Sequence, residues 1–412
     1  MDDTERRRLV AATLIVLTAA SPALTLFSFT CGRVSAATIE HEAIFIDSPE
    51  DFTPENGVSG GDGSFEDPFI IEGLEIGAGP YSVWECIHIS NVNSHVIVRE
   101  VYVHSGYEGI NLWNCTNVSV EDSIISDNWG SAIHIRRSHH ITISNCSVLS
   151  SATSMGHGLL IDSSSYLTIT GNQFEGKGIY FSTPEDLYAD SPDEWYSSHT
   201  ITTDNLVDGV ALLYYKNQSG IVLDDVSASQ VIIAKCSSAA VKGLSITGGD
   251  MAVFVVNSRD VTISQCHISR NFVGIHLHNS PGCSVFDNEV TNGYDTGIWL
   301  GNGCNGSSIT DNFVTGYDNY SLRVEMCSSI ISGNTAHDGG GISVGYYVGP
   351  VIISNNTVDH CRFGVTAVNM YSAMLTIQGN IVSDCWQGIS MTLGSANNIS
   401  DNSLVGNTYG VM

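Results

Sequence analysis

Side chains suited to sugar chemistry gather between residues 88 and 180 of this sequence. His134 or His157 could act as a general base or acid, because an imidazole titrates near neutral pH. Asp162 would orient that imidazole or share its proton, and Arg136 would hold a uronate carboxylate. The paired carboxylates of ordinary glycosidases are not evident. Further candidate substrate contacts in this region are His88, Glu108, Asn111, Trp113 and Tyr180.

Two stretches of extra sequence flank this region, at residues 150–157 and 183–199. The second stretch places aromatic rings beside carboxylates, and Glu185, Asp186 and Trp195 are its candidate substrate contacts. Such a mixture suits a sugar ring, which has an apolar face and a hydroxyl rim. Long loops on a rigid scaffold often carry binding sites, so we expect the two stretches to wall a groove. The competing interpretation is that these outward residues are simply solvated.

A metal site is a second chemical possibility. His276 and His278 would point two imidazoles from one face of a strand, about 7 Å apart, as in a copper or zinc site. Stacked turn carboxylates could bind calcium instead, because calcium prefers several oxygen ligands. Aspartate is also a favoured turn residue, so these turns need no ion. The turns in question are Tyr294-Asp295, Tyr317-Asp318, His337-Asp338 and Asp359-His360.

An internal repeat supplies the elements that must position these side chains. Alternating apolar residues, a polar turn, an asparagine and a closing glycine recur at intervals of roughly 20 to 24 residues in most units. Alternating apolar runs are short strands with one face inward. Three such strands per unit predict an all-β fold, a right-handed parallel β-helix of about 14 coils of 20–31 residues. The units begin at Ile87, Ile110, Ile133, Leu159, Ile179, Val210, Val231, Val253, Ile275, Ile298, Tyr320, Ile342, Val365 and Ile389.

Stacked coils about 4.8 Å apart would form a rod roughly 65–70 Å long, in which residues of adjacent units lie on top of one another. Asparagines at one phase of the repeat could then bond one another through their amides. They are Asn172, Asn288, Asn312, Asn334, Asn356, Asn380 and Asn402. Cysteines are also near-stacked, so one disulfide, Cys361–Cys385 or Cys304–Cys327, is a candidate. Stacked cysteines are, however, often only small packed hydrophobes.

Composition and the N-terminus indicate the compartment and the partners. Lys and Arg number 15 against 43 Asp and Glu, and the net charge of −28 repels nucleic acid and anionic lipid. Residues 6–8 are arginines, an apolar run follows to about Phe29, and Val34-Ser35-Ala36 offers a cleavage site. The run is long enough to be an uncleaved anchor, which would be the sole membrane contact. We therefore expect a secreted or cell-surface protein; its oligomeric state stays open.

The expected organisation has three parts. Residues 1–37 would be a signal peptide or N-terminal membrane anchor, residues 38–86 an N-terminal cap with the first irregular coils, and residues 87–412 the β-helix. Gly410-Val411-Met412 looks like the start of another coil rather than a C-terminal cap. Because an open parallel stack exposes strand edges, we expect further repeats or a partner to cover that end.

The repeat resembles a known family, together with the segment Gly60-Gly61-Asp62-Gly63-Ser64-Phe65-Glu66-Asp67-Pro68-Phe69-Ile70-Ile71-Glu72-Gly73. Over about residues 50–412 the chain resembles archaeal surface β-helix proteins of the NosD-like group. These belong to the carbohydrate-binding and sugar-hydrolysis class of the pectin-lyase-like superfamily. The resemblance implies the fold but not the activity, since this architecture hosts lyases, hydrolases, epimerases, adhesins and a copper-enzyme maturation factor. Of the polygalacturonase motifs, only Gly156-His157-Gly158 is matched.

Three functions follow as hypotheses. In the first, the protein binds and possibly processes a polysaccharide, with a uronic-acid glycan favoured, on the outward face of its early coils. An enzyme of this kind would be a polysaccharide lyase, hydrolase or epimerase. The second is a non-catalytic structural or adhesive rod, and the third a copper-handling accessory protein. The sequence requires no cofactor, and calcium or copper are the ions that it could use.

Overall fold

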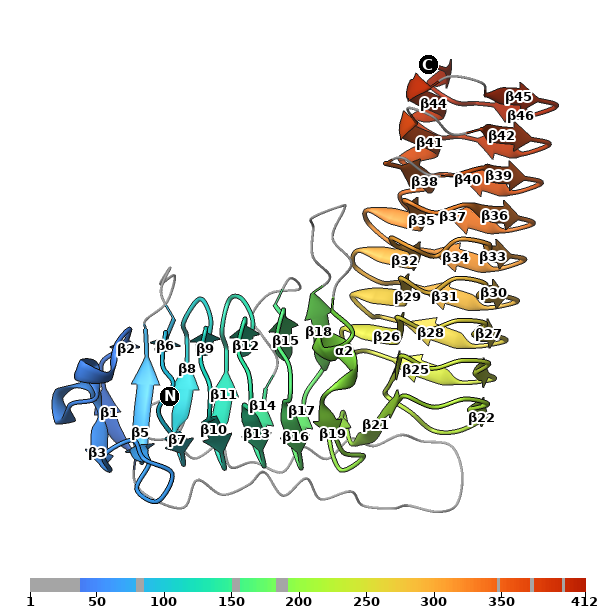
Figure 1. Ribbon diagram of the computed structural model, residues 1–412. Coiled ribbons are helices and arrows are strands. Elements are labelled where there is room, and N and C mark those ends of the chain that lie inside the picture. Colours follow the sequence, from blue (N-terminus) through green and yellow to red (C-terminus); the bar gives the residue numbers. More distant parts are fainter. Residues whose placement is uncertain are drawn as a thin grey trace, which may run out of the picture.

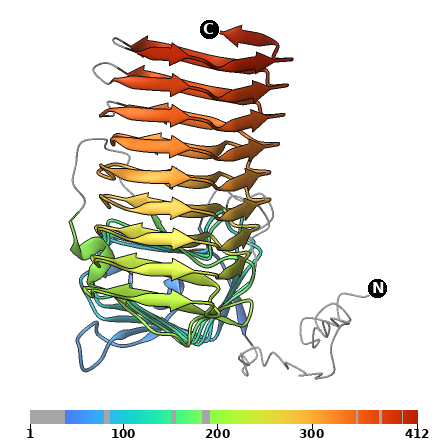
Figure 2. The same ribbon diagram turned by 90° about the vertical axis from the view of Figure 1, so that its right-hand side faces the viewer.

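The computed structural model describes residues 38–78, 85–149, 156–182, 192–346, 349–370, 374–394 and 397–412. Nearly all of the regular structure consists of β-strands wound into parallel coils, so the predicted all-β solenoid is confirmed. Figure 1 shows two stacks of coils that run in different directions. In Figure 2 the first stack lies behind the lower coils of the second.

The first stack has three sheets, named here sheets 1 to 3. Sheet 1 contains β1 (Ile39–His41), β5 (Leu74–Gly77), β8 (Tyr102–His104), β11 (Ile124–Ser126), β14 (Ser147–Val148), β17 (Gln173–Phe174) and β20 (Leu206–Val207). Sheet 2 contains β2 (Ile44–Ile46), β6 (Ile87–Ser90), β9 (Ile110–Trp113), β12 (Ile133–Arg136), β15 (Leu159–Asp162) and β18 (Ile179–Ser182). Sheet 3 contains β3 (Val58–Gly60), β4 (Phe69–Glu72), β7 (Val96–Arg99), β10 (Val118–Glu121), β13 (Thr142–Ser144), β16 (Thr168–Thr170) and β19 (Thr200–Ile201).

The second stack has sheets 4 to 6, of which sheet 4 is joined to sheet 1 by the antiparallel pairing of β20 with β21. Sheet 4 contains β21 (Val210–Lys216), β23 (Gln230–Ala234), β26 (Met251–Val256), β29 (Val273–His278), β32 (Thr296–Leu300), β35 (Tyr320–Glu325), β38 (Ile342–Gly345), β41 (Phe363–Met370), β44 (Gln387–Gly394) and β47 (Tyr409–Val411). Sheet 5 contains β22 (Val222–Asp224), β24 (Ala240–Lys242), β27 (Thr262–Ser264), β30 (Ser284–Phe286), β33 (Ser307–Thr310), β36 (Ser329–Ser332), β39 (Val351–Ser354), β42 (Leu375–Gln378) and β45 (Asn398–Ser400). Sheet 6 contains β25 (Ser245–Thr247), β28 (His267–Ser269), β31 (Glu289–Thr291), β34 (Phe313–Thr315), β37 (Thr335–His337), β40 (Thr357–Asp359), β43 (Ile381–Ser383) and β46 (Ser403–Val405).

Short helices complete the described elements: η1 (Pro49–Asp51), η2 (Pro54–Asn56) and α2 (Glu194–Ser197). The strands form because apolar residues alternate and every second side chain enters the core between the sheets. Ile133 and Ile135 of β12 are fully buried, for example, whereas Arg136 is exposed. Ile133 pairs in register with Leu159, and Leu159 pairs with Ile179, so the predicted stacking of residues from adjacent units is confirmed.

The predicted asparagine ladder is present in the second stack. The side-chain amide of Asn288 donates to the carbonyl oxygen of the Asn312 side chain at 2.9 Å, and the same bond recurs from Asn312 to Asn334 at 2.9 Å. It continues through Asn356 and Asn380 to Asn402. In the first stack, Asn172 bonds to Asn205 in the same way. These buried amides satisfy the backbone groups of the turns as well, which fixes the register between coils.

The coils do not form the single rod that was predicted, because the chain changes direction after β20. Val207 pairs antiparallel with Val210 across Asp208 and Gly209, whose φ angles are 50° and 79°. Both residues of this two-residue turn are left-handed, as a type I′ hairpin requires. The reversal starts a new stack, so the coil that contains Val210 does not continue the coil of Ile179. The strand register also moves the start of two predicted units. Leu213, and not Val210, pairs with Val231. Leu322, and not Tyr320, pairs with Ile298.

The contact between the two stacks, called the joint below, buries the open end of sheet 2. The side-chain oxygen of Gln230 accepts the backbone N–H of Ile179 at 3.1 Å, and its amide donates to the Ile179 carbonyl at 2.6 Å. A side chain thus takes the place of the next strand. Ile232 and Phe254 of sheet 4 point out of the second stack and join the core of the first. The apolar surface that they bury stabilises the joint.

Candidate functional site

The outer face of sheet 2 carries three columns of side chains, one residue per coil. The register that aligns them runs through β6, β9, β12, β15 and β18. We call this surface the sheet 2 face. The turn column consists of Glu85, Glu108, Ser131, His157 and Lys177; the middle column of His88, Asn111, His134, Leu160 and Tyr180; and the last column of Ser90, Trp113, Arg136, Asp162 and Ser182.

A buried carboxylate–imidazole pair lies at the centre of this face. One oxygen of Glu108 lies 2.7 Å from Nδ1 of His134, and the other accepts the Asn111 amide at 2.5 Å. Because the carboxylate can only accept, Nδ1 of His134 carries the proton. Nε2 of His134 is buried and has no hydrogen-bond partner among the described residues. This arrangement leaves an unprotonated Nε2 on an imidazole that a carboxylate holds in place.

An exposed column lies beside the pair. Nε of Arg136 is 3.5 Å from a carboxylate oxygen of Asp162, and Trp113 of the adjacent coil is 41% exposed. Asp162 thus pairs with Arg136, and the carboxylate that orients His134 is Glu108, which the sequence had suggested only as a substrate contact. The column offers a flat apolar ring, a guanidinium and a carboxylate in line.

The N-terminal end of the sheet 2 face contains residues that sequence analysis missed. Asp47 accepts the Ser90 hydroxyl at 2.5 Å and lies 3.4 Å from Nε2 of His88. Glu85 lies 3.5 Å from the Asn111 amide. Both carboxylates lie within residues 38–86, which were treated as a cap. Position within the coil could have identified Glu85 from the sequence, because it precedes the first core residue of its strand by two, as Glu108 does.

His157 and Tyr180 belong to the joint and not to the surroundings of His134. Asp250 of the second stack is fully buried, and one of its oxygens lies 2.9 Å from Nδ1 of His157. Its other oxygen accepts the backbone N–H groups of Gly158 and Gly178 at 3.2 and 3.0 Å. Tyr180 stacks on His157 with ring centroids 4.1 Å apart. Sequence reasoning could not find Asp250, because it belongs to the other stack.

Part of the expected groove walls lies outside the described residues. Glu185 and Asp186 lie outside the described residues, as do residues 150–155. Trp195, in α2, is partly buried and packs against the core of the first stack. Asp193, just before α2, binds Lys235 at 2.8 Å and the Asn257 amide at 2.9 Å. The end of this insertion therefore fastens the first stack to the second.

His276 and His278 point away from the core of the second stack, since their neighbours Ile275 and Leu277 enter that core. The joint covers this part of sheet 4, so both residues are buried. His276 stacks on Trp299 with ring centroids 4.0 Å apart, and the Arg323 guanidinium lies 4.4 Å from the Trp299 ring. Burial holds the pKa of His276 well below its usual value and lowers the pKa of His278 to about 4.

The two rings of this histidine pair are 6.2 Å apart between centroids. Within the described part of the chain, no third histidine, cysteine, aspartate or glutamate places a ligand atom beside them. The copper or zinc site proposed for His276 and His278 therefore has two imidazoles and no further side-chain ligand of these types in the described structure.

The ten described cysteines are buried free thiols, including Cys361, Cys385, Cys304 and Cys327. The two candidate disulfides are therefore not formed in this structure. The thiols lie against backbone carbonyls of the preceding coil, such as Cys304 against Leu277 at 3.3 Å. Burial raises the pKa of Cys304 well above its usual value and that of Cys327 to about 12. They act as small packed hydrophobes.

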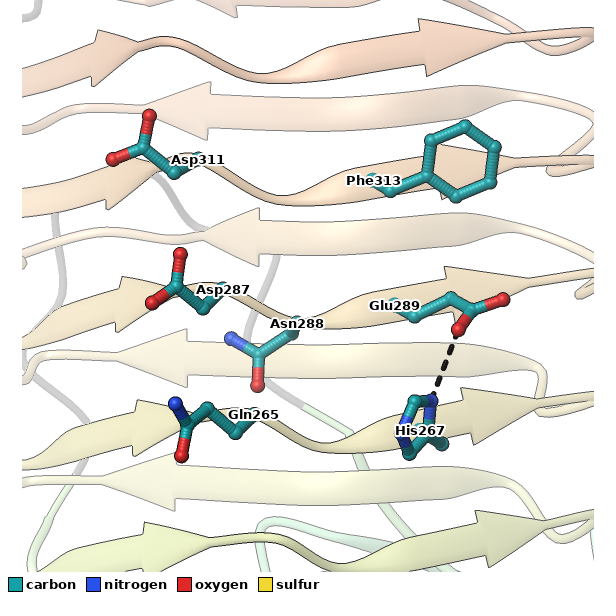
Figure 3. Close-up of a pocket in the computed structure, with 7 residues that line it drawn as sticks. All are labelled: Gln265, His267, Asp287, Asn288, Glu289, Asp311 and Phe313. Carbon is teal, nitrogen blue, oxygen red and sulfur yellow. Dashed lines mark hydrogen bonds and ion pairs between the residues drawn. The ribbon is translucent and has the colours of Figure 1, made fainter.

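A second, acidic surface is hollowed between sheets 5 and 6 of the second stack (Figure 3). Its volume is about 700 Å³, and its lining includes three carboxylates and the exposed ring of Phe313. His267 and Glu289, neighbours on adjacent strands of sheet 6, pair on one side of it at 3.0 Å. Sequence analysis did not single out this hollow. Its lining residues are Gln265, His267, Asp287, Asn288, Glu289, Asp311 and Phe313.

Within the described residues, no helix is both long and apolar enough to cross a bilayer. Residues 196–347 match the family model of the periplasmic copper-binding protein NosD. No curated protein matches the sequence.

Several solved structures are similar in fold. A mutant of the periplasmic alginate epimerase AlgG is 12% identical over 81% of this chain and 78% of that chain, with a TM-score of 0.41. The A-module of mannuronan C-5 epimerase AlgE6 from Azotobacter vinelandii is 10% identical over 81% of this chain and 88% of that chain, with a TM-score of 0.32. The enzymatically active domain of tailspike protein 2 from bacteriophage CBA120 is 12% identical over 88% and 52% of the two chains, with a TM-score of 0.33.

The family model that describes the right-handed β-helix region matches residues 80–191 and 315–412. These two segments include most of the sheet 2 face and the later coils of the second stack. Together they make up just over half of the sequence, and the chain therefore belongs to the right-handed β-helix family.

Proposed function

We propose that this protein binds a polysaccharide along the sheet 2 face, outside the cytoplasm, with uronic-acid polymers as the favoured class. One observation carries the proposal: the exposed column of Trp113, Arg136 and Asp162 runs directly beside the buried Glu108–His134 pair. A sugar ring would stack on Trp113, and Arg136 would hold a carboxylate through its planar fork. The predicted N-terminal leader supports a location outside the cytoplasm.

The net charge of −28 opposes an anionic polymer at long range. Screening limits this repulsion to about 8 Å at physiological ionic strength, so the contacts made on the face decide the affinity. Arg136 is half exposed and lies within that range of any chain bound against Trp113.

Replacing Trp113 by alanine should weaken polysaccharide binding at least about tenfold, or ~1.4 kcal/mol, because the stacking platform is lost. Titration calorimetry with oligouronates of alginate and pectin would measure the change. Trp386→Ala is the matched control, since Trp386 is 48% exposed but lies in the second stack. Equal losses in both variants, or no binding of any polysaccharide by the unaltered protein, would leave the structural or adhesive rod as the better explanation.

Proton transfer to or from the bound sugar is a second candidate function, favoured by the unpartnered Nε2 of His134. His134→Ala and Glu108→Gln should each lower turnover of a uronic-acid polymer about 100-fold, with less than a tenfold effect on binding. His140→Ala is the control, because His140 is exposed and stacks on Tyr166 away from the pair.

Three assays on one polymer would separate the possible reactions: new unsaturated ends for a lyase, new reducing ends for a hydrolase, and proton NMR for an epimerase. Turnover that survives His134→Ala would show that the pair is structural. The copper-handling alternative retains His276 and His278 as its residues, and the same copper affinity after replacing both by alanine would remove it.

A further inference from the structure

Two histidines and an aspartate converge where strands β37 and β40 of sheet 6 end, in the second stack and away from the sheet 2 face. His337 ends β37 and Asp359 ends β40, and the parallel register places these two residues side by side. One oxygen of Asp359 lies 2.9 Å from Nδ1 of His337 and 3.2 Å from Nδ1 of His360. Each of the three residues offers a ligand atom within 4.8 Å of the other two.

These separations match those between the ligands of one small metal ion. Zinc binds imidazole nitrogen and carboxylate oxygen at about 2.0–2.2 Å, so neighbouring donors of a tetrahedral site lie about 3.3 Å apart. The two measured separations, 2.9 and 3.2 Å, need only small side-chain shifts to admit the ion. Two imidazoles and a carboxylate suit zinc or copper rather than calcium, which prefers oxygen ligands.

A fourth residue orients this set. Nε2 of His337 lies 3.0 Å from a carboxylate oxygen of Asp338. Both ring nitrogens of His337 thus face carboxylates and donate to them; a metal ion would displace the proton from Nδ1, while the Nε2 proton would remain bonded to Asp338. Carboxylates behind ligating histidines commonly fix the tautomer and the ring orientation in this way.

The cluster is also accessible from solvent. The exposed fractions of the side chains are 35% for His337, 24% for Asp359 and 56% for His360. An ion can therefore enter, and water can complete its coordination. A contrasting pair, His267 and Glu289 of the same sheet, has one imidazole and one carboxylate and belongs to no such three-residue cluster among the described residues.

We propose that His337, Asp359 and His360 bind one divalent transition-metal ion of the zinc and copper class, with Asp338 as a positioning residue. The ion would link two successive coils of the second stack. Because it would bind the folded protein and not the unfolded chain, it would stabilise these late coils. The site is independent of the proposed polysaccharide binding.

Titration of the full chain, without a histidine tag, with ZnCl₂, CuSO₄ and CaCl₂ tests this proposal. We expect one zinc or copper ion per chain at this site, and an affinity that falls at least tenfold in His360→Ala and in Asp338→Asn. The matched control is His267→Ala, which should leave affinity and stoichiometry unchanged. His360 and His267 are both exposed, so neither variant should alter the fold.

Thermal unfolding gives a second measurement. Saturating zinc should raise the unfolding temperature of the unaltered protein and of His267→Ala, but not of the double variant His337→Ala with His360→Ala. Unchanged affinity in the double variant would overturn the proposal. A response to calcium alone would also overturn it, since it would reveal only an acidic surface.

Discussion

Acidification from about pH 7 to about pH 4.5 should lower the free energy of unfolding by several kcal/mol. Three buried histidines at the joint carry this effect. Burial lowers the pKa of His199 and that of His278 to about 4, and holds the pKa of His276 well below its ordinary value of 6.5. Nδ1 of His199 accepts the backbone N–H of Leu167 at 3.3 Å, so protonation would also break that hydrogen bond.

The direction of the effect follows from where the protons bind. Below about pH 6.5 the unfolded chain takes up a proton at each of these histidines, whereas the folded chain stays neutral there until about pH 4. Stability present above pH 6.5 is therefore lost as the pH falls through this window. One pKa unit corresponds to about 1.4 kcal/mol, so His199 and His278 each contribute ~2–3 kcal/mol of destabilisation at pH 4.5, and His276 acts in the same direction.

Urea unfolding at the two pH values would measure this loss, and His276→Phe provides a direct control. Both ring nitrogens of His276 are buried without a hydrogen-bond partner among the described residues, and the ring stacks on Trp299. Phenylalanine keeps an aromatic ring in this place and cannot take up a proton. The variant should be at least as stable at pH 7 and should lose less stability on acidification than the unaltered protein. The exposed His267→Phe should behave as the unaltered protein; identical acid losses in all three proteins would refute the role of His276.

Removing the Asp250 carboxylate should destabilise the joint by about 3–5 kcal/mol. The carboxylate is fully buried and holds His157 and two backbone N–H groups of the first stack, while Nζ of Lys177 lies 3.9 Å away. In Asp250→Ala the His157 imidazole and the two backbone N–H groups would remain buried without the carboxylate that accepts their hydrogen bonds. Burial lowers the pKa of Lys177 and Asp250 opposes that shift, so loss of the carboxylate should lower this pKa further.

Asp224→Ala is the matched control for this experiment. Asp224 lies 3.9 Å from Lys242 in the second stack, but both side chains are about half exposed, so the expected cost is at most ~1 kcal/mol. Asp250→Asn keeps one acceptor oxygen, so its loss of stability should lie between those of Asp250→Ala and Asp224→Ala. Hydrogen exchange should rise in β18 and β26 of Asp250→Ala and stay unchanged in β41 and β44. Uniform destabilisation across both stacks, or a loss no larger than that of Asp224→Ala, would contradict the role of Asp250 at the joint.

The periodicity of the sequence alone determined where the coils lie and which of their side chains enter the core. Ile133, Leu159 and Ile179 stack as predicted because a two-residue alternation sets which side chains enter the core, and the repeat length sets the register. The asparagine ladder follows for the same reason, since every coil places its asparagine at one phase of the turn. These are local properties that each unit repeats. The column of Trp113, Arg136 and Asp162 on the sheet 2 face is a direct consequence.

Which outward residues are truly exposed could not be read from that periodicity. His276 and Phe254 point outward from their strands, yet both are buried, because the second stack packs across the end of the first. The dipeptide Asp208-Gly209 is typical of a two-residue hairpin turn. Gly209 also fits the regular spacing of the closing glycines, so the sequence was interpreted as one more coil. Only the tertiary structure shows where the reversed chain then packs.

The candidate sites, too, were determined partly by the sequence and partly by the tertiary structure. The sequence determined that His134 and Glu108 lie on adjacent coils, and that His337-Asp338 and Asp359-His360 occupy successive turns. The tertiary structure decided that Glu108 rather than Asp162 holds His134, that His157 meets Asp250, and that three ligand atoms converge at Asp359. The physical reason is that repeat spacing specifies backbone register, whereas hydrogen bonding and ion binding depend on side-chain directions and on contacts between distant coils.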